Sequence, residues 1–223
     1  MLFKYDEVKQ HLQTRLCDPK RNVTLLNNLV TTDYDIYTAY YAILLDEESH
    51  EGATTSVLVS KNLLRYFGVT SEQLAIDAQK ADLCRGIFVF DMLEATIRNP
   101  MIYNEKINLI GKHVDISKSP VSSFVLTNKI MDYGASLVIQ PAVRYMIGEM
   151  LNCDFYLIPS SIHDNLIMPD TGMFTGEELV ALVRSINSNP EAIKPEDILS
   201  DDILWCSRDG DKVVAIKYTG GDD

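Results

Sequence analysis

The sequence is short of basic residues: it has 20 lysines and arginines against 32 aspartates and glutamates, for a formal net charge of −12. This balance disfavours direct binding to nucleic-acid phosphates or anionic lipid, because both reward clustered Lys and Arg. An acidic surface can instead mimic nucleic acid in the basic groove of an enzyme, although it more often serves solubility. We therefore expect no direct nucleic-acid binding, and an acidic nucleic-acid-mimicking inhibitor of a defence enzyme is kept as an alternative.

Long apolar runs are also missing. No run approaches the roughly 20 residues that a helix needs to cross a bilayer, so we expect no membrane association. The N-terminal stretch MLFKYDEVKQHLQTRL places charges where a signal peptide would have an uncharged core. We therefore expect a soluble protein that is not exported.

Cysteines are few and widely spaced. Cys17, Cys84, Cys153 and Cys206 form no C-x-x-C pair, so neither a zinc knuckle nor a thioredoxin-type site is indicated. Free thiols are typical of the reducing cytoplasm, which is where we expect the protein. The G-x-G-x-x-G, P-loop, G-x-S-x-G and H-E-x-x-H motifs are absent as well, so we expect no cofactor and no metal.

The composition is that of a folded protein, with 46% apolar and 23% charged residues among 223. This length suits one well-cored domain, so we predict a single domain over residues 1–223, with residues 219–223 frayed. Strand-like runs follow one another across turn residues, and helical patterns intervene singly. This order predicts an α+β fold, with a mainly antiparallel sheet, helices packed on it and a C-terminal β-hairpin.

Helices are predicted where apolar residues recur at helical spacing or where capping residues open a segment. These segments are residues 5–16, 61–67, 71–81, 88–99, 141–150 and 176–186, with one further turn at 195–197. In the last long helix, Leu179, Leu182, Val183 and Ile186 are expected to share the buried face.

Strands are predicted from apolar and β-branched runs between turn residues. These runs are residues 36–45, 54–60, 123–127, 135–139, 155–158, 166–168, 203–207 and 212–218. The Asp209-Gly210 pair between the last two is a strong hairpin signal. Residues 46–52, which include His50, are expected to form an exposed connection, and residues 101–120 to be irregular or a weak strand.

The stretch DFYLIPSSIHDNLIMPD, residues 154–170, sets a polar centre between two apolar strands. Ser160, Ser161, His163 and Asp164 supply a nucleophile, a base and an orienting carboxylate, which makes a hydrolase an alternative function. Residues this close along a tight loop cannot easily form both contacts of a triad. The competing interpretation is that the Ser and Asp side chains cap turns and that His163 packs or bonds locally.

A working site at this loop would need groups from other segments. Asn128, Asp132 and Tyr133 lie in a predicted turn, and Asp201 and Asp202 precede the final hairpin. From these we take Asn128, Tyr133 and Asp201 as candidate binding residues that could meet the loop.

Several segments resemble one family in the same order and spacing. They are SVLVSKNLLRYFGVTSEQLAIDAQKAD (56–82), VLTNKIMDYGA (125–135), the stretch 154–170, EELVALVRSIN (177–187) and PEDILSDDILWCSRDG (195–210). The family is the bacterial domain of unknown function numbered fifty-six eighty-eight, common in anaerobic gut bacteria. The resemblance covers residues 56–211, while residues 1–55 match weakly. The chain is also similar, more faintly, to the uncharacterised YtpQ-like family.

The resemblance implies no activity. Family members often look like cargo of mobile elements, which implies a role in host or element defence. The chain has Asp164 where the family's loop usually carries Glu after the His, which argues against an absolutely required catalytic Glu there. We therefore expect a non-enzymatic binding or interaction protein with a protein partner, and a hydrolase with its site around the loop from Ser160 to Asp164 is the first alternative.

Overall fold

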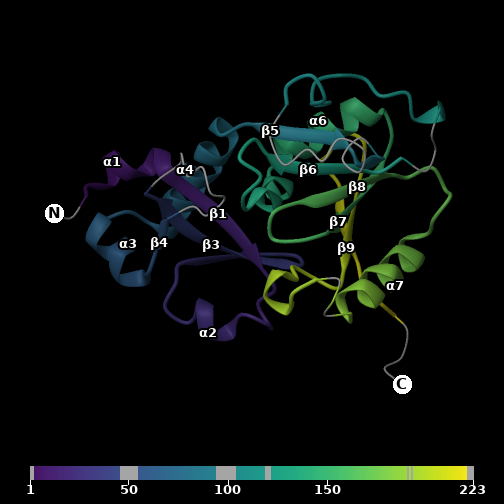
Figure 1. The fold of residues 1–223 in the computed structure, drawn as a ribbon. Coiled ribbons are helices and arrows are strands. Elements are labelled where there is room, and N and C mark those ends of the chain that lie inside the picture. Colours follow the sequence, from purple (N-terminus) through teal and green to yellow (C-terminus); the bar gives the residue numbers. More distant parts are fainter. Residues whose placement is uncertain are drawn as a thin grey trace.

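Two antiparallel sheets, each covered by helices, make up the protein (Figure 1). The computed structural model describes residues 3–45, 55–93, 104–118, 122–189, 191 and 193–219. The predicted α+β class and the C-terminal hairpin are confirmed. The expected connection at residues 46–52, with His50, and the expected frayed end at 220–223 lie outside the described residues.

The first sheet is organised around β3, which pairs with three other strands. Its strands are β1 (Leu12–Cys17), β2 (Thr31–Tyr34), β3 (Tyr37–Leu44) and β4 (Ser56–Leu58). β1 pairs with β3 along its whole length, whereas β2 pairs with the first half of β3 and β4 with its end. All eight residues of β3 are buried, as expected for a strand covered on both faces.

Helices lie on both faces of this sheet. The elements are α1 (Tyr5–Val8), η1 (Lys9–His11), α2 (Val23–Leu26), α3 (Lys61–Phe67) and α4 (Ser71–Cys84). Leu26 of α2 packs with Cys17 and Tyr40, on the face opposite to the one that α4 covers. Leu74 and Ala78 of α4 pack in one buried cluster with Leu12 and Tyr41 of the sheet. Figure 1 shows α4 beside β1.

The second sheet has six antiparallel strands in the order β10-β9-β7-β8-β6-β5. Their bounds are β5 (Ile87–Asp91), β6 (Phe124–Asn128), β7 (Phe155–Pro159), β8 (Asn165–Pro169), β9 (Ile203–Cys206) and β10 (Val213–Ile216). The predicted β7–β8 and β9–β10 hairpins both form. β6 lies next to β8, so the turn after β6 comes close to the loop between β7 and β8.

Helices lie on both faces of the second sheet. The remaining elements are η2 (Ile116–Lys118), η3 (Gly134–Ile139), α6 (Pro141–Leu151), α7 (Gly176–Asn187) and η4 (Pro195–Asp197). Phe155 and Leu157 of β7 pack in the cluster that holds α6, while the alternate residues Tyr156 and Ile158 pack with α7. This alternation is the period of two that a strand imposes on its side chains.

The two sheets share one core. Ile36 and Tyr37, where the β2–β3 turn enters β3, are buried with Phe155, Leu204 and Cys206 of the second sheet. The tip of the β2–β3 hairpin therefore packs between the sheets, and it forms one wall of the site described below.

The expected helix over residues 5–16 is wrong in its second half. After α1 and η1 the chain extends as β1 (Leu12–Cys17). Leu12 and Leu16 fit helical spacing, but they also fall on one face of a strand. Pairing with β3 decides between the two, because it gives hydrogen-bond partners to the backbone of this buried segment.

The predicted type of secondary structure is also wrong in two further segments. The predicted helix over 88–99 begins as β5 (Ile87–Asp91), which pairs with β6, and residues 94–99 lie outside the described part. The predicted strand over 135–139 is η3 (Gly134–Ile139). Short apolar runs do not distinguish helix from strand, so the neighbouring segments decide.

The buried face of α7 also differs from the prediction. Leu179, Val180 and Val183 are buried, whereas Leu182 and Ile186 are 54% and 47% exposed. α7 is rotated about its axis so that Val180, rather than Leu182, packs against the sheet.

Candidate functional site

The loop between β7 and β8 is a tight turn closed by its own serine. The Ser161 N–H donates to Asp164 O at 3.2 Å, and the backbone N–H of His163 donates to Ser161 Oγ at 3.0 Å. Thr127 Oγ1 of β6 donates to His163 O at 2.8 Å, which ties the loop to the neighbouring strand. The loop conformation is therefore fixed before any ligand is considered.

The turn after β6 lies against this loop. Asn128 holds the turn through its side chain, which donates to Asp132 O at 2.7 Å and accepts from the Asp132 N–H at 3.2 Å. Met131 and Tyr133 both have a positive φ, near 55° and 50°. Non-glycine residues seldom adopt this backbone, and its cost of order 1 kcal/mol is borne where surrounding contacts enforce it.

His163 joins the loop to the turn through one ring nitrogen. Nδ1 lies 3.2 Å from the Tyr133 N–H and 3.3 Å from Asp132 Oδ1. The hydrogen bond to Asp132 raises the pKa of His163 above 6.5, although burial opposes the shift. The sequence candidates His163, Tyr133 and Asn128 thus meet in space, and Asp132 supplies the carboxylate.

The serines are not aligned with this histidine. Among the described residues, no hydrogen bond joins the His163 ring to the hydroxyl of Ser160 or Ser161. Burial raises the pKa of the Asp164 carboxyl, and the neighbouring Ser160 and Ser161 hydroxyls oppose this shift. An Asp–His pair is present, therefore, but a Ser–His–Asp triad is not assembled.

Arg15 of β1 connects the first sheet to the same turn. Its guanidinium lies 3.8 Å from the centroid of the Tyr133 ring, a cation–π contact. Its Nε donates to Gln13 at 2.8 Å, and Gln13 Nε2 donates in turn to Asp132 O at 3.3 Å. These contacts explain how the positive-φ turn is held in place.

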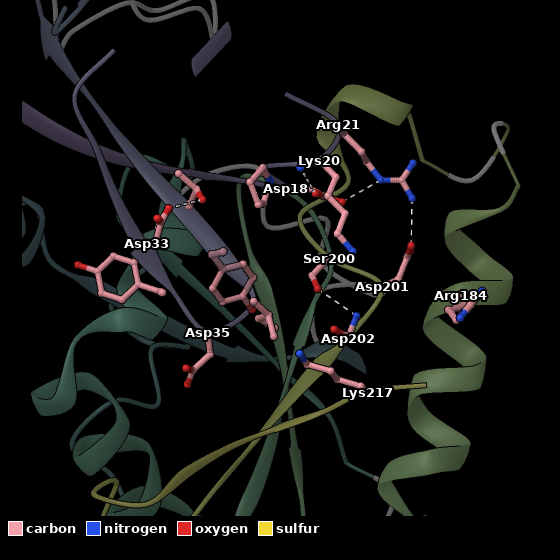
Figure 2. Close-up of a pocket in the computed structure, with 15 residues that line it drawn as sticks. Asp18, Lys20, Arg21, Asp33, Asp35, Arg184, Ser200, Asp201, Asp202 and Lys217 are labelled. Atoms are coloured by element: carbon pink, nitrogen blue, oxygen red, sulfur yellow. Dashed lines mark hydrogen bonds and ion pairs between the residues drawn. The ribbon is translucent and has the colours of Figure 1, made fainter. Parts of the chain in front are cut away.

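A separate cavity of about 640 Å³ lies between the two sheets (Figure 2). We call it the charged cleft. It is lined by Asp18, Pro19, Lys20, Arg21, Asp33, Tyr34, Asp35, Ile36, Tyr37, Thr38, Arg184, Ser200, Asp201, Asp202 and Lys217. The lining comes from the segment after β1, the β2–β3 hairpin, α7, the segment before β9 and the residue after β10. A second hollow of about 510 Å³ shares residues 33–37 with it.

Arg21 organises one side of the charged cleft. Its guanidinium lies 3.1 Å from Asp18 and 3.1 Å from Asp201. Asn187 of α7 donates to the other Asp201 oxygen at 2.9 Å. Asp201 was a sequence candidate for the loop, but its contacts place it here, in the wall of the charged cleft.

Two lysines reach into the charged cleft without being neutralised. Within the described part of the chain, no carboxylate forms an ion pair with Lys20 or Lys217. Figure 2 shows them on either side of Ser200 and Asp202. The buried Ser200 hydroxyl accepts from the Asp202 N–H at 3.0 Å.

Sequence reasoning missed the charged cleft apart from Asp201 and Asp202. Its residues are spread from Asp18 to Lys217, and no short spacing links them. The one local signal was the density of polar residues in the β2–β3 turn, and turns are usually polar for other reasons.

Neither a metal centre nor an activated thiol is found in the described residues. No group of three or more His, Cys, Asp or Glu side chains there could hold a metal ion. The four cysteines are free, and burial raises the pKa of both Cys17 and Cys206 to about 12. These two thiols are therefore protonated near neutral pH and are poor nucleophiles.

In the described part of the chain, no helix has the length and apolar character to span a membrane.

Comparison with known proteins gives one match, which is to a protein family. No curated protein and no solved structure matches the chain. A family model described as a family of unknown function, DUF5688, matches residues 1–208, so the match also takes in the N-terminal part. The chain therefore belongs to the DUF5688 family.

Proposed function

We propose that this protein binds a small polar ligand in the charged cleft and does not transform it. The observation that carries the proposal is the pair of ammonium groups, Lys20 and Lys217, at a cavity of about 640 Å³ between the two sheets. Small-molecule sites span about 300–1,000 Å³ and use a few fixed polar groups to orient the ligand. The cleft has both properties.

The lining supports binding rather than turnover. Its described residues include neither histidine nor cysteine, the residues that most often act as base or nucleophile near neutral pH. The Arg21 ion pairs with Asp18 and Asp201 hold the wall in one arrangement. A fixed, charged wall favours recognition because less side-chain freedom is lost when the ligand binds.

A cytoplasmic location is part of the proposal. The four cysteines are free, and Cys17 and Cys206 are buried. Thiols persist in this form in a reducing compartment. Fractionation of the native host cell should place the protein with soluble cytoplasmic markers.

The test is a binding screen on the full chain. A panel of small polar metabolites is added to the purified protein, and unfolding is followed through the fluorescence of Trp205, the single tryptophan. A ligand that binds the folded state raises the melting temperature by mass action. The double variant Lys20→Glu/Lys217→Glu should lose the effect.

The control carries the same charge change elsewhere. Lys112 and Lys194 are exposed and lie outside the charged cleft, so Lys112→Glu/Lys194→Glu should keep the ligand response. If no panel member binds, or if the cleft variant responds like the control, the proposal is wrong. A protein partner and the nucleic-acid-mimicking inhibitor then stay as untested predictions, to be pursued by affinity capture.

A hydrolase is the second candidate, favoured by the contact between His163 Nδ1 and Asp132 Oδ1 at 3.3 Å. An aspartate at Nδ1 orients a histidine so that Nε2 can act as a base, here on water because neither serine contacts the ring. Activated esters and phosphoesters are the substrates to screen. If this function is real, His163→Ala abolishes turnover and changes stability little; a lower melting temperature with no turnover to lose supports a structural role.

A further inference from the structure

We infer that the charged cleft selects a dipolar ligand, a small molecule with an ammonium group at one end and an anionic group at the other. This inference rests on the proposed function and adds the chemical class of its ligand. The juxtaposition of Asp35 with Lys20 and Lys217 across one cavity carries it.

The two sides of the charged cleft differ in charge. Asp33 and Asp35 come from the β2–β3 hairpin and lie on one side of the opening (Figure 2). The four basic residues lie on the other side, around Ser200 and Asp202; they are Lys20, Arg21, Arg184 and Lys217. Asp18, Asp201 and Asp202 share that second side, so a ligand that spans the opening meets carboxylates at one end and, at the other, a mixed wall with one more basic than acidic residue.

Several of these charges are already engaged. Arg21 is shared between two aspartates, and Arg184 lies 4.1 Å from the centroid of the Tyr218 ring. The Asp33 carboxylate accepts from Thr38 Oγ1 at 2.8 Å. In the part of the chain that the structure describes, Asp35, Asp202 and the two lysines make no such side-chain contact. The groups still open to a ligand are thus a carboxylate on one side, and two ammonium groups with one carboxylate on the other side, which leaves the second side net positive.

A ligand of a single sign fits this lining less well. Five aspartates and four basic residues line the charged cleft, so a simple anion is opposed by the summed field of the wall. A simple cation is opposed locally, because Lys20 and Lys217 repel it at the basic end. A dipolar molecule places each of its charges against the matching wall.

The probes form a series that varies the distance between the two charges. They are ω-amino carboxylates of increasing chain length, from glycine through aminohexanoate to aminooctanoate. At each length the matched alkylammonium and alkyl carboxylate carry one charge only, and an aminoalkyl phosphate replaces the carboxylate to distinguish the two anionic ends. Binding to the full chain is measured by calorimetry at low salt, since exposed charge interactions are screened by salt.

We expect one chain length to bind about twofold to fivefold more tightly than either of its single-charge analogues, which is the scale of one exposed ion pair. Asp35→Asn should remove this advantage by weakening the ammonium end, and Lys20→Met/Lys217→Met should remove it by weakening the anionic end. Asp211→Asn and Lys194→Met, at exposed positions outside the cleft, should preserve it.

The outcomes separate the two proposals. If a single-charge analogue binds as tightly as every dipolar probe, or if Asp35→Asn leaves the advantage intact, the dipolar ligand is wrong while binding in the cleft survives. If no dipolar probe binds but another metabolite of the panel does, the inference fails in the same way. If nothing binds at all, both proposals fail.

Discussion

His163 and Asp132 face each other across two connections of the second sheet, with Nδ1 of the imidazole 3.3 Å from Oδ1 of the carboxylate. The same Nδ1 lies 3.2 Å from the N–H of Tyr133. Nδ1 can accept a hydrogen bond from the Tyr133 N–H only when Nδ1 carries no proton. A hydrogen bond from Nδ1 to the Asp132 carboxylate requires a proton on Nδ1. Protonation of His163 therefore exchanges one contact for the other.

A pH dependence follows from this contact. Because Asp132 raises the pKa of His163 in the folded state, the folded protein binds the proton more tightly than the unfolded chain. The resulting stabilisation is fully present below the ordinary pKa of about 6.5 and is lost as pH rises through the folded-state pKa. Its size is that of a partly exposed ion pair, about 0.2–1 kcal/mol.

The measurement is urea unfolding followed by Trp205 fluorescence across this pH range. Asp132→Asn should lose this part of the pH dependence, and Asp211→Asn, at an exposed position, should keep it. A wild-type curve that overlays the Asp132→Asn curve after a constant offset would contradict the role of the ion pair.

Asp82 in α4 forms a buried pair with Arg85, at 3.2 Å. Asp82→Ala leaves the guanidinium buried without its carboxylate, so we expect a loss of about 3–5 kcal/mol in the free energy of unfolding. Asp6→Ala, which breaks the exposed pair with Lys9, is the matched control and should change stability much less, because solvent screens an exposed pair. Equal losses of stability in the two variants would show that burial of the Asp82–Arg85 pair does not increase its contribution to stability.

The same carboxyl gives a second pH effect. Burial raises the pKa of Asp82 to about 7, against the opposing effects of Arg85 and of the Thr14 hydrogen bonds. A raised pKa means that ionisation is penalised in the folded state, so this contribution is fully present below the unfolded value near 3.8 and is lost as pH rises to 7 and above. Asp82→Asn should flatten the stability curve over this window, as measured by urea unfolding.

Gly148 marks a close approach between α6 and the turn of the last hairpin. A Cβ at this position would lie 1.7 Å from Arg208 O, so Gly148→Ala should destabilise the fold by about 1–3 kcal/mol. Alanine otherwise stabilises a helix by about 1 kcal/mol relative to glycine, so a net loss of stability would show that the close approach outweighs helix propensity. Glu149→Ala removes only the exposed contact with Arg208 at 3.4 Å and should change stability little; thermal unfolding compares the two.

Thr175 caps α7 through its hydroxyl, which accepts from the Glu178 N–H at 3.2 Å, while Glu178 bonds back to the Thr175 N–H. Thr175→Ala should therefore cost about 1 kcal/mol. Thr171→Ala, in the same exposed connection, should be neutral within about 0.5 kcal/mol. Denaturant midpoints at constant slope measure both changes.

The elements that the sequence predicted correctly are those whose signals are local. α3 ends at Gly68, where φ is 70°, and α4 begins after the Thr70 cap. Pro141 opens α6 at its first turn. Such caps act within one turn of chain, so they need no knowledge of distant partners.

The wrong assignments depended on distant partners. Residues 12–16 could have continued a helix, and they became a strand because β3 offers a full ladder of hydrogen bonds. β5 formed in the same way beside β6. Leu182 and Ile186 of α7 stayed exposed because the rotation of a helix on a sheet is set by the sheet's surface.

The sequence by itself determined the α+β class, the two C-terminal hairpins, the capped helices and the family, because these follow from local patterns and from ordered motifs. Only the tertiary structure decided that His163 meets Asp132 and that Lys20, Asp35 and Lys217 surround one cavity. These residues lie far apart along the chain, and their proximity comes from strand order and from the packing of one sheet against the other, which no local spacing encodes.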